Sequence, residues 1–456
     1  MNNAFQIVKG LDIPISGSAV QEVASAGEAA MWSVNPSDFH GIVPRLLVQV
    51  GDPVKAGSPI YCDKNRPEIR FVSPVSGVVA DIVRGEKRKL LHILIQADAT
   101  IEFTHFPIND PLKLPAEQVR NALLESGLWT VFKQRPYDLI ADPKKTARDI
   151  FVTGFDSSPL APDYEFLLKG QGADLQKGLD ALTRLTEGKV YLGLSTKTQA
   201  PELVQAARVE INRFDGPHPA GLVGTQINRI KPLNKGEVVY TLNALDVAAI
   251  GRFFSQGKVD LTRLVAVTGP MVRKPQYLRC KPGMPIQNLV KGNIHTEAPL
   301  RIVCGNALTG VKTDPHGYLC ANTYQITVLK EGEGIHELFG WAMPRLNLFS
   351  FSKTYFTNLV RRFQPDKTYE LDTRQLGGER ALIMSGEYEK VFPLDILPEH
   401  LTRACVSGNM ERQEQLGIYE VAPEDFALCE FVCTSKVQVQ KVVREALDKL
   451  KIENGD

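Results

Sequence analysis

The sequence lacks any apolar run long enough to cross a membrane, and its charges nearly cancel. None of the 456 residues belongs to a run of 18 or more consecutive apolar residues, the length that indicates a transmembrane helix. The net charge is only +1, whereas a nucleic-acid-binding protein usually carries a basic face. The N-terminal string MNNAFQIVKGLDIPISG has no apolar signal-peptide core. We therefore expect a soluble, intracellular chain that binds no nucleic acid.

Cysteine is scarce and irregularly spaced. The seven cysteines are an odd number without a paired pattern, which favours reduced thiols in the cytoplasm over a disulfide framework. Hydrophobic residues make up 43% and charged residues 23% of the chain, which are ordinary values for globular proteins. At this length we expect three or four domains, each with a core of its own.

Residues 45–96 alternate short β-rich runs with turn dipeptides, which predicts a compact β module. The pattern resembles the barrel-sandwich fold of biotinyl and lipoyl domains, which present a modified lysine on a hairpin. Lys64 lies near that place, but the stretch from Lys64 to Pro74 is longer than a lipoyl hairpin. We therefore interpret Lys64 as a solvated lysine and the module as structural.

The pattern of residues 110–255 predicts an α/β unit. Helical periodicity appears in PAEQVRNALLESGLW and in ADLQKGLDALTRL, and strands are predicted at 149–154, 189–194 and 237–242. Alternating strands and helices favour a parallel sheet. Between the strands, DGPHPAGLVGT at 215–225 holds His218, which could carry a proton or order a turn. Without a partner acid or second histidine at ligand spacing, we favour the turn.

The loop before the first of these strands has little glycine. Ligands in doubly wound folds sit at strand ends, and a phosphate cradle there needs glycines. Residues 125–137 contain only Gly127. Bulky and basic side chains stand there instead: Trp129, Phe132, Lys133, Arg135 and Tyr137. These side chains would fill the space that a cofactor needs.

This layout resembles a known family. In the C subunit of the Rnf complex and in the flavin-bearing subunit of respiratory complex I, a glycine-rich loop is followed by a strand and an acidic, proline-containing loop. Here the strand and the loop FDSSP at 155–159 remain. The whole chain most resembles the A subunits of Na⁺-translocating NADH:quinone oxidoreductases. Five strings carry the resemblance: KGLDIPISG at 9–17, SGLWTVFKQRP at 126–136, DGPHPAGLVGT at 215–225, ELFGWAMP at 337–344 and YEKVFPLDILP at 388–398.

The resemblance implies a peripheral subunit, without a transmembrane segment, on the cytoplasmic side of the bacterial inner membrane. It implies a six-subunit complex that oxidises NADH, reduces ubiquinone to ubiquinol and pumps Na⁺ from cytoplasm to periplasm. That complex would use flavins and Fe–S clusters carried by other subunits, so we expect no cofactor, metal or catalytic residue in this one. Its own role would be docking, or shaping the quinone step. Two alternatives stay open: a quinone-binding protein with its own pocket, and a free-standing flavin NADH dehydrogenase.

The resemblance also assigns the remaining regions. Residues 256–335 resemble a β-grasp, soluble-ligand-binding module, in which His316 reads as a turn residue and single buried thiols are expected at Cys280, Cys304 and Cys320. In the Rnf relative, C-terminal helices bear cysteine arrays that hold Fe–S clusters with four thiolates each. Here only Cys405, Cys429 and Cys433 stand in that region, too few for a cluster or a zinc site. Core packing is the better interpretation of these thiols.

One segment looks suited to a partner. Residues 337–363 interleave aromatic and basic residues with no acid after Glu337, a composition found in interface cores and at membrane surfaces. An interdomain arm packed on its own chain is an equal alternative. The candidate docking residues are Trp341, Arg345, Phe349, Phe351, Arg361 and Arg362.

We thus predict five regions of a multidomain α/β plus α+β chain. They are a barrel-sandwich region at 1–105, a Rossmann-like domain without a cofactor loop at 106–255, a β-grasp domain at 256–335, an aromatic and basic arm at 336–384, and a helical domain at 385–456. Within the second region, we expect the side chains of loop 126–137 to face outward, toward membrane subunits or quinone.

Overall fold

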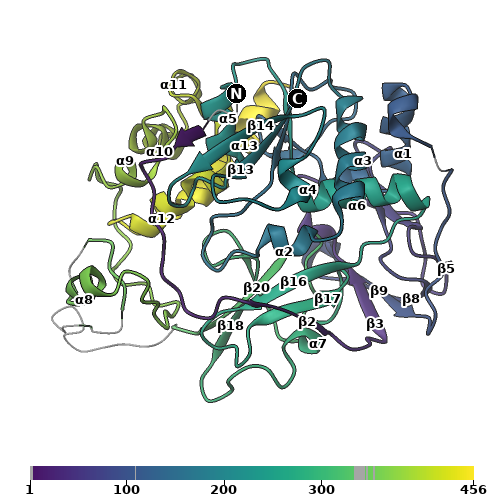
Figure 1. Cartoon of the computed structure of the whole chain (residues 1–456), viewed down its shortest axis with the longest axis horizontal. Helices are drawn as coiled ribbons and strands as arrows, with labels where there is room; N and C mark the ends of the chain where they lie inside the picture. Colours follow the sequence, from purple (N-terminus) through teal and green to yellow (C-terminus); the bar gives the residue numbers. More distant parts are fainter. Residues whose placement is uncertain (1–3, 108, 333–344, 346–347, 353–354, 456) are drawn as a thin grey trace.

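The structure is a computed structural model, and it describes the chain except residues 1–3, 108, 333–344, 346–347, 353–354 and 456. Two large sheets lie one above the other in Figure 1, with the barrel-sandwich module beside them and the C-terminal helices packed against the upper sheet. None of the described helices is long and apolar enough to cross a membrane. The α/β, barrel-sandwich and helical character expected from the sequence is confirmed.

The barrel-sandwich module is made of two small sheets that face each other. Its interior is apolar, with Ile60, Tyr61, Ile93 and Ile95 fully buried. Lys64 is exposed just after the hairpin strand β6, as the solvated interpretation predicts. The first sheet has the order β3 (Met31–Val34), β9 (Leu90–Ala97), β8 (Gly77–Arg84), β5 (Pro53–Val54), and the second β4 (Pro44–Leu46), β6 (Pro59–Asp63), β7 (Arg70–Val72).

A seven-stranded sheet forms the α/β unit. The three predicted strands are present as β12 (Ile150–Thr153), β13 (Val190–Ser195) and β15 (Val239–Asn243). They pair in parallel, because their β-branched and aromatic residues are buried between two helical layers. The full order is β1 (Ala4–Gln6), β14 (Glu210–Asp215), β13, β12, β15, β10 (Lys133–Arg135), β11 (Leu139–Ile140), with the last two antiparallel.

The strand order changes direction between β12 and β15. The chain runs outward from β12 through β13 to β14 and then returns to place β15 on the other side of β12. In open parallel sheets, ligands bind beyond the carboxyl ends of the strands at such a switch point. The carboxyl ends of β12 and β15, at Thr153 and Asn243, are therefore where a ligand site would be expected.

Helices α3 (Gly172–Thr183) and α6 (Ala244–Gln256) pack closely beside this sheet. Glycines make the approach possible, since a Cβ on Gly251 would lie 1.7 Å from the Asp174 carbonyl oxygen and one on Gly178 would lie 2.0 Å from the Val247 carbonyl oxygen. The other helices of the unit are α1 (Ala116–Glu125), α2 (Tyr164–Leu168), α4 (Pro201–Val204) and α5 (Val223–Ile230).

A six-stranded sheet follows in the chain and includes a strand from the N-terminus. β2 (Val20–Ser25) forms one edge of this sheet and pairs with β17 (Gln276–Cys280), just as β1 forms an edge of the seven-stranded sheet. The N-terminal residues thus tie two other sheets together, which the single predicted region 1–105 did not anticipate. The order is β19 (Val311–Thr313), β18 (Leu300–Cys304), β20 (Gln325–Lys330), β16 (Arg263–Thr268), β17 (Gln276–Cys280), β2, and α7 (Ile286–Val290) lies in the β17–β18 connection.

The C-terminal region is helical and forms a second hydrophobic core. Its interior contains Tyr388, Leu401, Phe426 and Leu447 among other buried side chains. The helices are α9 (Tyr388–Val391), α10 (Pro398–Ser407), α11 (Met410–Gln415), α12 (Ala427–Val432) and α13 (Val439–Glu453), and α8 (Thr357–Phe363) belongs to the preceding arm.

A buried arginine joins the helical region to the α/β unit. Arg135, on β10, has no exposed surface. Its guanidinium donates to the Asp425 carboxylate at 2.6 Å and to the Glu424 carboxylate at 3.1 Å, and also to the Glu420 carbonyl at 3.3 Å. The Asp425 carboxylate accepts a further hydrogen bond, 2.7 Å, from the Ala422 N–H. Charge-assisted hydrogen bonds of this kind are about twice as strong as neutral ones.

We expect Arg135→Ala to lower the free energy of unfolding by about 3–5 kcal/mol, because it leaves the Asp425 carboxylate buried without its cation. Lys133→Ala, an exposed neighbour on the same strand, should have little effect. Arg135→Met combined with Asp425→Leu should recover much of the loss, since neither charge then remains buried. Urea unfolding of the three variants measures this, and an Arg135→Ala protein as stable as Lys133→Ala would contradict the ion pair's structural role.

Candidate functional site

Loop 126–137 is interior, so the expectation that its side chains face outward is wrong for four of the five residues named. Trp129, Phe132 and Arg135 have no exposed surface and Tyr137 is only 2% exposed. Only Lys133 is exposed, and its ammonium lies 3.4 Å from the Asp138 carboxylate. Of the five residues proposed to bind quinone or a partner, only Lys133 has a side chain exposed at the surface.

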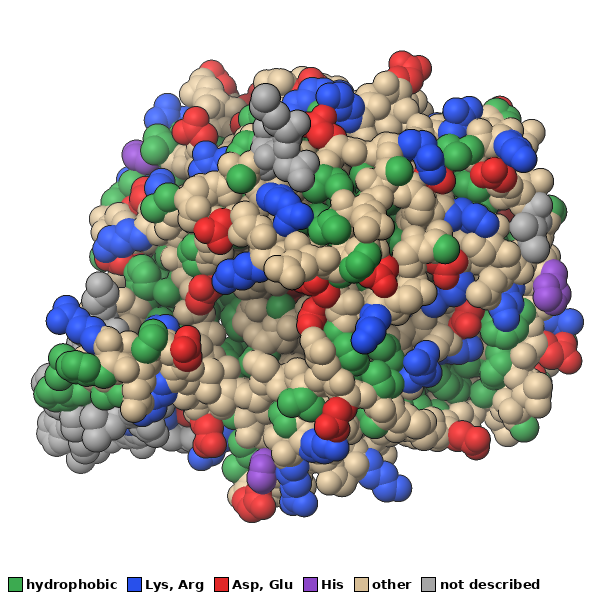
Figure 2. Space-filling model, viewed as in Figure 1, with side chains coloured by type: hydrophobic (Ala, Val, Ile, Leu, Met, Phe, Trp, Pro, Cys, Tyr) green, Lys and Arg blue, Asp and Glu red, His purple; other side chains and the backbone are tan. Residues whose placement is uncertain are grey.

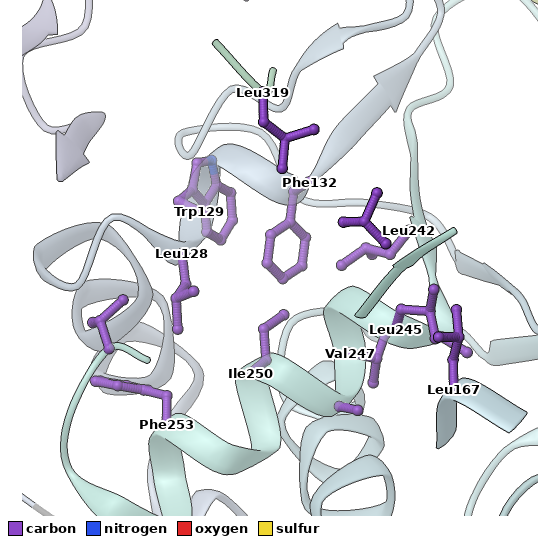
Figure 3. Packing of buried hydrophobic residues seen from close by; sticks show 14 of the residues in the cluster. Leu128, Trp129, Phe132, Leu167, Leu242, Leu245, Val247, Ile250, Phe253 and Leu319 are labelled. Atoms are coloured by element: carbon purple, nitrogen blue, oxygen red, sulfur yellow. The ribbon is translucent and has the colours of Figure 1, made fainter. Parts of the chain in front are cut away.

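The aromatic residues of the loop occupy the interior between β15 and α6. The Trp129 indole N–H donates to the Ala141 carbonyl at 2.8 Å, and its ring stacks on Phe132 at 4.8 Å. Both rings meet Tyr240 of β15 edge to face. Figure 3 shows Phe132 pointing toward Ile250 of α6. The bulky residues fill their own domain, as the glycine-poor composition of the loop indicates.

Tyr137 belongs to the other core. It packs within the C-terminal hydrophobic cluster, and its hydroxyl accepts a hydrogen bond, 3.0 Å, from the Asn454 side-chain amide. Together with Arg135, it makes the end of this loop the contact that holds the helical region. Sequence reasoning missed this role because the acidic partners at 424–425 lie almost 300 residues away in the chain.

The switch point at the carboxyl ends of β12 and β15 is filled by protein. The loop after β12 is held against the six-stranded sheet, where the Gln325 amide donates to the Pro159 carbonyl at 3.1 Å and the Asp163 N–H donates to the Tyr277 hydroxyl at 2.8 Å. A Cβ on Gly193 of β13 would lie 2.1 Å from Gln226 Oε1. The loop after β12 and the Gln226 side chain thus lie beside the carboxyl ends of these strands.

His218 is buried at the same edge of the sheet. Its Nδ1 lies 3.0 Å from Ser157 Oγ, and Ser157 Oγ accepts a hydrogen bond from the Gly221 N–H at 2.8 Å. The His218 N–H donates to the Asp12 carboxylate at 2.9 Å. His218 thus links two loops and the N-terminal segment through hydrogen bonds. This favours a structural role in the turn over a role as proton carrier. Burial lowers the pKa of His218, against smaller opposing effects of Asp156 and Asp12.

The scattered thiols are packed in cores. Cys429 and Cys433 are almost fully buried in the C-terminal cluster, and the Tyr388 hydroxyl donates to Cys433 Sγ at 3.0 Å. Burial raises the pKa of Cys405 to about 12 and that of Cys429 well above its usual value, which disfavours the thiolate that binds metals. In the part of the chain that the structure describes, no group of three or more His, Cys, Asp or Glu side chains could hold a metal ion.

The cysteines and the histidine in the region of the six-stranded sheet have structural surroundings. Cys280 and Cys304 are buried, while Cys320 is half-buried. His316 lies in an exposed turn, where its N–H donates to the Asp314 carboxylate at 2.8 Å. The structural interpretation of these residues is confirmed for the two buried thiols and for the turn.

The arm contains both packed and exposed residues. Trp341 lies outside the described residues, and Arg345 is half-buried. Phe349 and Phe351 pack against the C-terminal core, and the Arg361 guanidinium lies over the Phe349 ring at 5.3 Å. Arg362 is exposed. The arm is therefore partly packed on its own chain, as the alternative interpretation proposed.

One face of α8 is apolar and unprotected. Phe356, Leu359 and Phe363 are 60%, 55% and 81% exposed, and their spacing places them on one side of the helix. We call these three residues the arm patch. The opposite side of α8 contacts the rest of the arm, where the Thr357 hydroxyl donates to the Leu348 carbonyl at 2.7 Å. Figure 2 shows hydrophobic side chains gathered at the lower left, where Figure 1 places α8.

A large cavity lies beside the arm, with a volume of about 980 Å³. It separates the arm from α12, α13 and the turn before β19. Apolar side chains of the arm and of α12 line it together with charged groups, among them Phe349, Phe351, Tyr355, Phe431, Arg380 and Lys436. Its size falls within the range of small-molecule sites, and its lining suits a ligand with an apolar part and a carbonyl.

We expect His218→Asn to have a lower free energy of unfolding than wild type at neutral pH. This difference should shrink as the pH falls. Because burial holds the pKa of His218 below its ordinary value of 6.5, the folded wild type binds this proton less readily than the unfolded chain. The stabilising contribution of neutral His218 is complete above pH 6.5 and is lost below it. Urea unfolding of both proteins at several pH values measures the difference; a gap that stays constant from about pH 7.5 to 5 would contradict buried neutral His218.

Comparison with known proteins assigns most of the chain to one family. The family model described as the NqrA N-terminal barrel-sandwich hybrid domain matches residues 5–98. The NqrA second alpha/beta domain matches residues 114–259, and the NQRA C-terminal domain matches residues 264–314. The three matches follow the barrel-sandwich module, the seven-stranded sheet and the six-stranded sheet in order.

Whole-length relatives agree with these matches. A protein of Serratia proteamaculans (strain 568), named as the A subunit of Na(+)-translocating NADH-quinone reductase, is 38% identical over 98% of this chain and 100% of its own length. A Yersinia pseudotuberculosis protein of the same name is 37% identical over 98% of this chain and 100% of its own. One from Rhodopirellula baltica is 35% identical over 98% of each chain.

Solved structures are more distant. A crystal structure of NAD+-reducing NiFe-hydrogenase in the air-oxidized state is 12% identical, covers 77% of this chain and 67% of that chain, and has a TM-score of 0.37. The identity over the full length of the curated relatives decides the assignment: the chain belongs to the A-subunit family of the Na(+)-translocating NADH-quinone reductases.

Proposed function

We propose that this chain is the peripheral A subunit, on the cytoplasmic side of the bacterial inner membrane, of a six-subunit complex. That complex oxidises NADH, reduces ubiquinone to ubiquinol and pumps Na⁺ from the cytoplasm to the periplasm. The observation that carries the proposal is the 38% identity over the whole length of a relative named as the A subunit of Na(+)-translocating NADH-quinone reductase. The chain takes part in the translocase as a docking component, and in isolation it is not catalytic.

The arm patch supports the docking role. Three large apolar side chains lie exposed at the N-cap and along one side of the short helix α8. The stretch from residue 338 to residue 365 contains no acid. Exposed apolar clusters with neighbouring arginine are typical of interface cores. We propose that the arm patch binds a membrane subunit of the complex, with Arg362 at the rim of the contact.

The sheet topology supports a finer description of two domains. The parallel order β14-β13-β12-β15 is the 3-2-1-4 order of a doubly wound half. We therefore propose that residues 106–255 form a Rossmann-like domain that has lost its cofactor loop, and that the six-stranded sheet is a β-grasp module.

A quinone-binding role is the second candidate. The 980 Å³ cavity beside the arm is the observation in its favour, because an aromatic and arginine lining suits a quinone ring and its carbonyls. A free-standing flavin dehydrogenase has less support, since protein atoms fill the switch point at Gly193 and Pro159.

We predict that the isolated chain, purified at neutral pH, binds neither FMN nor an Fe–S cluster. The reasons are the filled switch point and the three buried thiols of the C-terminal core, which are fewer than the four that a cluster needs. Absorption spectra and assays of flavin and acid-labile sulfide measure this directly. Cys429→Ser with Cys433→Ser should cost on the order of 1–2 kcal/mol per residue as a packing change. Stoichiometric flavin or sulfide, or loss of the complex's electron paramagnetic resonance signals in the double variant, would contradict the prediction.

We predict that replacing the arm patch by serine, as Phe356→Ser, Leu359→Ser and Phe363→Ser together, weakens assembly of the complex. The exposed side chains contribute little to the fold, so the free chain should unfold at nearly the wild-type temperature. Affinity purification through another subunit, followed by quantification of this chain, measures the loss.

A matched control is Ile452→Ser, which removes an equally exposed apolar side chain, 79% exposed, from the end of α13. This variant should assemble like wild type. If the purified complex contains as much arm-patch variant as wild type, and quinone reduction is unchanged, the docking proposal is wrong. Normal assembly with altered inhibitor sensitivity would instead favour the quinone cavity.

A further inference from the structure

A second cavity lies where the α/β unit meets the six-stranded sheet. Its volume is about 320 Å³. The α2 end and the start of α3 form one wall, the α6 face with Leu245 and Ala249 forms another, and β16 and β17 close the third side. In Figure 1, α2 lies between α6 and these two strands. Pockets at domain interfaces are common places for small-molecule ligands.

Four cationic side chains line this cavity, and none of them has an ion-pair partner among the described residues. They are Lys169, Arg252, Arg263 and Arg279. They come from three separate elements: the α2–α3 connection, α6 and the β16–β17 hairpin. Their convergence is thus a product of the tertiary fold, which the spacing in the sequence does not reveal.

Two of the arginines are held in place by the protein while leaving donors unused. The Arg263 guanidinium donates to the Ala321 carbonyl at 2.9 Å and lies over the Tyr324 ring at 4.7 Å. Arg252 donates to the Thr262 carbonyl at 3.3 Å, and its buried Nε has no hydrogen-bond partner in the part of the chain that the structure describes. Each of the two guanidinium groups donates one hydrogen bond among the described residues, out of five N–H donors, so each has donors left for an added acceptor.

Three acids lie in or near the cavity, and two of them interact with its arginines. The charge of Arg263 opposes the burial that raises the pKa of Asp246, and the charge of Arg252 contributes to lowering the pKa of Asp260. Asp174, the only acid among the described residues of the lining, accepts a hydrogen bond from the Ser255 hydroxyl at 3.2 Å. Asp246 lies behind Tyr324 and accepts its hydroxyl hydrogen bond at 2.6 Å, and burial raises the pKa of this carboxyl. Asp260 accepts the Thr262 hydroxyl at 2.6 Å. The lining therefore keeps an excess of positive charge.

We propose that this cavity binds a small organic phosphate. Arg252, Arg263 and Arg279 would hold the phosphate oxygens, since guanidinium groups match phosphate geometry with paired donors. The apolar part of the ligand would lie on side chains of α2, α6 and β16, namely Phe166, Leu167, Leu245 and Leu264. A dianion or trianion balances three to four cations better than a single carboxylate does. The site is independent of the arm patch and of the docking proposal.

Isothermal titration calorimetry of the purified full chain with ADP, pyrophosphate and adenosine tests the proposal. We expect ADP to bind at one per chain, pyrophosphate to compete with it, and adenosine not to bind. The double variant Arg252→Gln with Arg279→Gln should weaken ADP at least tenfold. The control Arg273→Gln with Lys291→Gln removes the same charge from exposed positions near the six-stranded sheet, outside the cavity lining, and should bind like wild type.

Two further variants separate loss of binding from loss of folding. Arg279 is exposed, so Arg279→Gln alone should fold normally and still weaken ADP if the double variant is unstable. Ala249→Trp keeps every charge but fills the cavity, and it should abolish binding. The proposal is overturned if wild type binds neither ADP nor pyrophosphate, if adenosine binds as tightly as ADP, or if the cavity and control variants lose affinity equally.

Discussion

The fold depends on one buried ion pair, between Arg135 of β10 and Asp425 at the start of the C-terminal helices. A guanidinium and a carboxylate that are both removed from water must satisfy each other, because either one alone is strongly destabilising. The pair therefore fixes the helical region at one place on the α/β unit. Tyr137 and Asn454 extend the contact to the end of α13.

The second constraint is that the space beyond the parallel sheet is filled. Gln226 lies against Gly193, and the loop after β12 is pinned to the six-stranded sheet through Pro159 and Asp163. Side chains of the chain itself thus lie where the strand order would place a ligand. The exposed features lie elsewhere, at the arm patch on α8 and at the two cavities between domains.

Much of this architecture could be predicted from local sequence signals. β-branched runs located β12, β13 and β15 to within two residues, and turn dipeptides located the barrel-sandwich module. The bulky residues of loop 126–137 indicated that its side chains fill space in the domain, and Trp129 and Phe132 are fully buried. The orientation of its side chains could not be predicted, because the sequence does not show that Arg135 faces two acids almost 300 residues away. Composition identified the aromatic arm but not which of its residues pack and which remain exposed.

Electron cryomicroscopy of the assembled complex would show whether the arm patch or loop 126–137 contacts other subunits. We expect partner side chains packed on Phe356, Leu359 and Phe363, with loop 126–137 still buried and the Arg135–Asp425 pair intact. A structure in which the arm patch faces bulk solvent, and loop 126–137 turns outward to meet a partner or a quinone, would contradict this expectation.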